Sequence, residues 1–213
     1  VAQLVELCTQ MGLPRGKKNI LMEAMVDANY SVTMDETNAL VAETVKLLHS
    51  IFEQADSVKG QDLVLFIGNT GSGKSTAVSY LIGAELESYL NAAGDRVYRV
   101  KEGGDVDTLN LPKIGQSLGI SETLYARGYQ SNELDSRVRL TDCPGFHENR
   151  GGIYELYTNI SIDQTIVSSN LLKSVVVVIP YESFREERAN PVVELMISLQ
   201  QVFPNLLKEG SDL

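Results

Sequence analysis

The residues best suited to chemistry in this chain lie in one glycine-rich segment. Gly68-Asn69-Thr70-Gly71-Ser72-Gly73-Lys74-Ser75 fits the pattern G-x-x-x-x-G-K-[ST]. Its glycines permit backbone conformations that turn successive N–H groups inward, where they can meet phosphate oxygens at close range. The lysine suits the β- and γ-phosphates of a nucleoside triphosphate, and the Ser75 hydroxyl suits Mg²⁺. The segment, called the phosphate loop below, therefore predicts a nucleotide site, with Thr76 expected at the α-phosphate.

A second motif, Asp142-Cys143-Pro144-Gly145, follows a strand candidate at 136–141. A carboxylate at a strand end can hold a magnesium-bound water across from Ser75. Gly145 can bring its N–H to the γ-phosphate. The alternative is an ordinary Asp-Pro-Gly turn without a ligand.

Together the two motifs resemble those of a P-loop GTPase of the translation-factor-related class, whose second motif is D-x-P-G. The strings at 113–117, 121–125 and 142–151 resemble those of a family of large G-domain proteins of protists and some intracellular bacteria. The phosphate loop also resembles those of septin, immunity-associated and chloroplast-import GTPases. The resemblance covers about residues 62–203. It implies Mg²⁺-dependent binding of GTP and GDP, slow hydrolysis, and a role as a switch or assembly GTPase.

The same resemblance points to Thr123 as a further magnesium ligand beside Ser75 and Asp142. It would belong to the segment that senses the γ-phosphate. Thr108 and Ser121 are alternatives in the same stretch, and Ser121 could instead cap a short helix.

The candidate catalytic residues follow the second motif. Phe146 stands where small GTPases carry the glutamine that orients the attacking water, and phenylalanine cannot take that role. His147 has a suitable intrinsic pKa for a base, and Arg150 could stabilise charge, although both types are common on exposed loops. Further candidates are Glu148, Arg185 and Arg188. We therefore expect slow hydrolysis, with the missing group supplied from outside the chain.

A guanine-reading N/T-K-x-D string does not occur in the sequence. The strand that would precede it should begin just past 204–207, so we expect that the parent protein continues beyond Leu213. The chain also begins with Val rather than Met, as a fragment would. The rival hypotheses are a divergent P-loop ATPase and a nucleotide-binding interaction module with little hydrolysis.

These residues need a particular arrangement of strands and helices. The apolar run 63–67 predicts a buried central strand that leads into the phosphate loop. Further strands are expected at 96–101, 136–141 and 174–179, the last buried on both faces. Helices are expected at 152–172 and 190–202. Strands that alternate with helices predict an α/β fold, here a P-loop NTPase with a mostly parallel sheet.

Residues 1–58 are expected to form a helical extension before a G domain at 59–213, incomplete at its C-terminus. Helices are predicted at 1–11 and 19–30, and Thr33 can cap a third. The third helix carries a broad apolar stripe, which favours packing on the next domain. Binding a protein partner, or forming a homodimer, is the alternative use of that stripe.

Composition limits the partners. Lys and Arg total 18 against 28 Asp and Glu, a net charge of −10, which argues against a nucleic-acid-binding surface but not against a nucleotide. The distant Cys8 and Cys143 predict reduced thiols rather than a disulfide or zinc site. No apolar run approaches the length of a membrane span. We therefore expect a cytoplasmic or otherwise intracellular protein, with delivery into a host cell left open.

Overall fold

The computed structural model describes residues 34–92, 94, 96–101, 111–115, 123–146, 152–185 and 190–203. The expected helices at 1–11 and 19–30 lie outside these residues. So do Cys8, Thr108, Ser121, His147, Glu148, Arg150 and Arg188.

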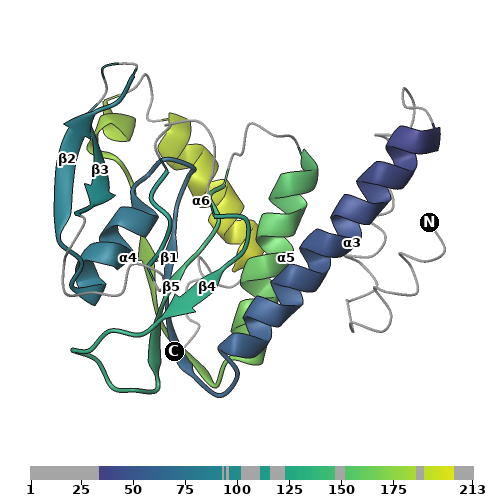
Figure 1. Ribbon diagram of the computed structural model, residues 1–213, viewed down its shortest axis with the longest axis horizontal. Coiled ribbons are helices and arrows are strands. Elements are labelled where there is room, and N and C mark those ends of the chain that lie inside the picture. The colour runs from purple at the N-terminus through teal and green to yellow at the C-terminus, as the bar shows by residue number, and fades with distance from the viewer. Residues whose placement is uncertain are drawn as a thin grey trace.

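The described chain alternates between helices and strands (Figure 1). In chain order the elements are α3 (Met34–Ser57), β1 (Asp62–Ile67), α4 (Lys74–Ile82), β2 (Leu86–Leu90), β3 (Arg96–Val100), β4 (Arg127–Tyr129), β5 (Val138–Asp142), α5 (Gly152–Ser168), β6 (Leu171–Val177), the short 3₁₀ helix η3 (Tyr181–Phe184) and α6 (Asn190–Val202).

A four-stranded sheet in the order β4-β5-β1-β6 lies at the centre. β1 runs parallel to both of its neighbours, β5 and β6, while β4 pairs antiparallel with β5. β2 and β3 form a separate antiparallel hairpin. The predicted α/β class with a mostly parallel sheet is therefore confirmed at this level.

Helices cover both faces of the sheet (Figure 1). Alternate side chains of a strand point to opposite faces. Accordingly, Leu65 and Ile67 of β1 pack in a core with Ile162 of α5, whereas Phe66 packs with Val78 of α4. The end of β1, from which the phosphate loop starts, is thus held from both sides.

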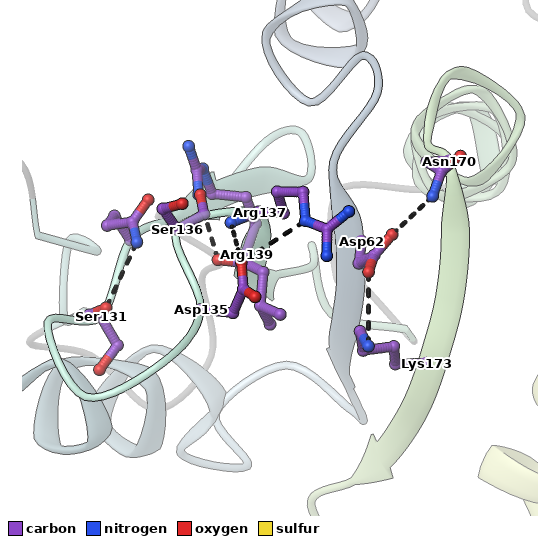
Figure 2. Close-up of polar contacts among 10 residues, drawn as sticks. Asp62, Ser131, Asp135, Ser136, Arg137, Arg139, Asn170 and Lys173 are labelled. Carbon is purple, nitrogen blue, oxygen red and sulfur yellow. Dashed lines mark hydrogen bonds and ion pairs between the residues drawn. The ribbon is translucent and has the colours of Figure 1, made fainter.

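The starts of the strands are tied together at the opposite end of the sheet (Figure 2). The Asp62 N–H donates to the Arg137 carbonyl at 2.8 Å. The Asp62 carboxylate accepts a hydrogen bond from Asn170 Nδ2 at 2.8 Å and lies 3.4 Å from Lys173 Nζ. The hydrogen bond from Asn170, with Lys173 beside it, holds the pKa of Asp62 below its ordinary value. Asp62 therefore links the beginning of β1 to the segments that lead into β5 and β6.

The expectation for the strand at 174–179 was wrong in one respect. β6 lies at the outer edge of the sheet formed by the described residues, Ser174 is exposed and Val177 is 37% exposed. A continuous apolar run indicates a strand, but it does not report how many neighbours that strand has.

The C-terminal half of α3 packs on α5, as its apolar stripe predicted. Leu48 and Ile51 form a buried cluster with Tyr157 and Ile160. The Tyr157 hydroxyl donates to Thr44 Oγ1 at 2.6 Å within this contact. Side by side in Figure 1, these two helices form one wall of the molecule.

Candidate functional site

The phosphate loop begins where β1 ends and closes into α4. Gly68 follows β1 directly, and a side chain there would collide with the Val178 carbonyl oxygen. Farther along, the Ser72 N–H donates to the Asn69 carbonyl at 3.1 Å, which tightens the turn. The glycine at 68 is therefore required by the close approach of the neighbouring chain.

The first turn of α4 faces this loop with its positive end. Helix α4 begins at Lys74 and carries no acidic residue in its first turn. The N–H groups of a first helical turn, here including those of Ser75 and Thr76, have no partner within the helix. Such a terminus attracts anions through its N–H groups and its dipole. Nothing in the first turn competes with an anion for that position.

Lys74 places a buried cation at the loop. Its side chain is 5% exposed, and Nζ donates to the carbonyls of Gly68 at 3.1 Å and Asn69 at 2.8 Å. The ammonium group thus lies across the beginning of the loop and is held there by backbone. A positive charge in this position can neutralise phosphate oxygens bound by the loop.

Three oxygen-bearing side chains from three separate segments meet at the end of β5. Ser75 Oγ donates to Asp142 Oδ2 at 2.7 Å, and Thr123 Oγ1 donates to the same oxygen at 3.1 Å. The two hydroxyl oxygens lie 3.5 Å apart. The structure therefore brings together the three residues for which the sequence predicted a shared role.

The Asp142 carboxylate is buried, at 1% exposed. Burial raises its pKa, while the hydrogen bond from Ser75, the charge of Lys74 and the hydrogen bond from Thr123 act in the opposite direction. Its second oxygen, Oδ1, is buried without a hydrogen-bond partner among the described residues. Buried polar atoms are normally satisfied, so this one suits a cation or an ordered water.

The chemistry of these donors fits magnesium. Within the described parts of the chain, no group of three or more His, Cys, Asp or Glu side chains could hold a metal ion. One carboxylate with two hydroxyls is a sparse set of hard oxygens. Mg²⁺ accepts such a set because it keeps several waters and is completed by substrate phosphates.

Phe146 belongs to the core rather than to the site. It is 4% exposed and packs with Ile67, Ile162 and Leu195. Phe146, whose position the sequence analysis considered for orienting a water, is thus used for packing. Of the other catalytic candidates, Arg185 is exposed at the end of η3, while His147 and Arg150 lie outside the described residues.

Two contacts of the loop had no signal in the sequence. Asn69 Nδ2 donates to the Pro191 carbonyl of α6 at 3.2 Å. Thr70 Oγ1 donates to the Phe146 carbonyl at 3.3 Å. The partners are 122 and 76 positions apart, so no local pattern could have paired them.

Comparisons of the chain with protein-family models, curated proteins and solved structures give no match. None of the helices in the described part of the chain combines the length and apolar character needed to cross a bilayer.

Proposed function

We propose that this chain binds a nucleoside triphosphate with Mg²⁺ through the phosphate loop, in a P-loop fold, and hydrolyses it slowly as a guanine-nucleotide switch or assembly domain. One observation carries the proposal. The hydroxyls of Ser75 and Thr123 and the carboxylate of Asp142 converge at the foot of a glycine-rich loop that holds a buried lysine. A simple turn would need neither the buried cation nor the buried carboxylate.

Each group then has a role. The N–H groups of the loop and of the first turn of α4 bind phosphate oxygens, and Lys74 neutralises part of their charge. Ser75, Thr123 and Asp142 hold Mg²⁺ directly or through its waters. When bound, Mg²⁺ offsets negative charge on the phosphate oxygens.

Slow hydrolysis follows from the use of Phe146 for packing. Phosphoryl transfer depends on an oriented water and on added positive charge. Phe146 supplies neither, so His147, Arg150 or a group from a protein partner must do so. Supply by a partner is the version that we propose.

Guanine is proposed on the resemblance of the motifs, and the choice of base can be measured directly. Thermal shifts with GTP, GDP, ATP and ADP, each with Mg²⁺, should favour the guanine nucleotides. Larger shifts with ATP and ADP would replace the guanine assignment with an ATPase.

The central test is Lys74→Ala, measured by isothermal titration with Mg²⁺ and the slowly hydrolysed analogue GTPγS. Loss of a charge-assisted contact, about 1.5–3 kcal/mol, should weaken binding by at least tenfold. Lys101→Ala is the matched control, because Lys101 lies 2.8 Å from Glu85 on an exposed surface and should leave the affinity unchanged. Equal affinities of wild type and Lys74→Ala would refute the phosphate site.

A further inference from the structure

The phosphate loop and the residue that follows the second motif form backbone hydrogen bonds with each other beyond the ends of β1 and β5. The Phe146 N–H donates to the Gly68 carbonyl at 3.1 Å, and the Thr70 N–H donates to the Phe146 carbonyl at 3.0 Å. These bonds form an isolated parallel bridge between Asn69 and Phe146. The segment just after Gly145 is therefore paired, backbone to backbone, with the loop itself.

Side chains reinforce this bridge on both partners. Thr70 Oγ1 adds a second hydrogen bond to the Phe146 carbonyl, at 3.3 Å. The Phe146 ring is buried in the core between the sheet and helices α5 and α6. Moving residue 146 away from the loop would break the backbone pair and withdraw the ring from that core.

Gly145 lies directly against the loop. A Cβ atom at this position would be 2.5 Å from Thr70 Oγ1 and 2.6 Å from Thr70 N. These distances leave no room for a side chain, because real Cβ contacts are longer. The two backbones are thus in direct contact at the residue expected to reach the γ-phosphate.

We propose that Thr70 and Phe146 are positioning residues that lock the second motif onto the phosphate loop. Asp142 and Gly145 then keep one position with diphosphate and triphosphate, and the response to the third phosphate is confined to the segment that carries Thr123. In that segment the Thr123 hydroxyl contacts Ser75 and Asp142, and the chain is anchored three residues later, where the Ala126 N–H donates to Ser161 Oγ. This inference rests on the proposed function, because it states how the same site is regulated.

Amide hydrogen exchange at single-residue resolution tests the lock. The protein is compared alone, with Mg²⁺ and GDP, and with Mg²⁺ and GTPγS. The Phe146 amide should be protected in all three states, with rates that agree within about fivefold, the effect of one ordinary hydrogen bond. Amides at 123–125 should change by more than that between the two nucleotides, whereas the Ala126 amide, which donates to Ser161 Oγ at 2.7 Å, should stay protected. A larger change at Phe146 between GDP and GTPγS would overturn the lock.

Thr70→Val removes the hydroxyl and keeps the shape of the side chain. The Phe146 amide should exchange about fivefold faster, and binding of GTPγS should weaken relative to GDP by about the same factor. Thr70→Ser should restore both values. A variant that weakens both nucleotides equally and is not rescued by serine would show a purely structural role and overturn the proposal.

Failure of the proposed function can be distinguished from failure of the lock. If the chain bound no nucleotide, neither GDP nor GTPγS would change the melting temperature or the exchange of loop amides 71–76. The lock is then judged on the protein alone. A protected Phe146 amide that Thr70→Val accelerates supports it, and an unprotected Phe146 amide in the wild type overturns it.

Discussion

Asp142 shows the cost of keeping a charge inside the molecule. Burial raises its pKa, which means that the folded protein disfavours the ionised form. The hydrogen bonds from Ser75 and Thr123 and the nearby charge of Lys74 reduce that cost without satisfying Oδ1. A neutral side chain would avoid this desolvation cost if the residue served packing alone. A bound cation would offset the cost, which favours a role for the carboxylate as a metal ligand.

Asp142→Asn separates stability from binding. The amide has nearly the same shape and removes the buried charge, so melting without metal should be unchanged or higher. Mg²⁺-dependent binding of GTPγS should weaken by at least tenfold, because the hard anionic ligand is lost. Thermal melts in EDTA and magnesium titrations by calorimetry measure the two effects. Asp135→Asn, at an exposed carboxylate, should keep the magnesium dependence. An undiminished dependence in Asp142→Asn would contradict the assigned role.

A second carboxylate, that of Asp62, lies at the beginning of β1, and its pKa is shifted in the opposite direction to that of Asp142. Asn170 and Lys173 hold the pKa of Asp62 below its ordinary value of 3.8. Because the folded-state pKa is the lower one, the contribution of Asp62 is fully present above pH 3.8 and is lost as the pH falls through the folded-state value. The contacts of the Asp62 carboxylate with Asn170 and Lys173, which link the beginning of β1 to β6, should therefore weaken in acid (Figure 2).

Asp62→Asn should lower the melting temperature at pH 7, because it removes the charge that faces Lys173. The difference from the wild type should shrink below pH 3.8 and vanish once Asp62 is protonated. Melts at steps between pH 7 and pH 2 measure it. Asp56→Asn, an exposed carboxylate on α3, is the control and should follow the wild type throughout. A constant difference between Asp62→Asn and wild type across this range would contradict the linkage.

Apolar runs and helical periodicity in the sequence predicted the central strand and the last helix. The helix expected at 190–202 is observed as Asn190–Val202, and the run at 63–67 lies within β1. The helix expected at 152–172 ends at Ser168, because the apolar pair at 171–172 continues its pattern but belongs to β6. β4 has three residues and too few positions to show a period.

Some residues of the candidate site could likewise be predicted from the local sequence, and others could not. The phosphate loop follows from residue spacing, and Asp142 from its place at a strand end. Thr123 came from resemblance, because a single threonine has no local pattern. The contact of Thr70 with Phe146 depends on how two strands align 76 positions apart, which only the assembled sheet determines.

At the scale of the whole molecule, the predicted boundary at residue 58 falls within a shared core. Val58 is buried in the same cluster as Leu65 and Ile162, and Leu48 is buried against α5. The part of α3 that contacts α5 should therefore unfold with the sheet rather than before it. If α3 and the sheet unfold in one transition, α3 is part of the domain that carries the phosphate loop rather than a separate extension.

Leu48→Ala tests this by opening a cavity between α3 and α5. Truncating a fully buried leucine should reduce the free energy of unfolding by about 2–5 kcal/mol. Native-state amide hydrogen exchange in rising urea should show the α3 amides at 45–55 and the β1 amides at 63–67 opening together. Lys46→Ala, an exposed residue of the same helix, should cost far less and controls for helix propensity. If the α3 amides opened at much lower urea than the β1 amides, α3 would be a separate unit, and the nucleotide affinity would then survive its unfolding.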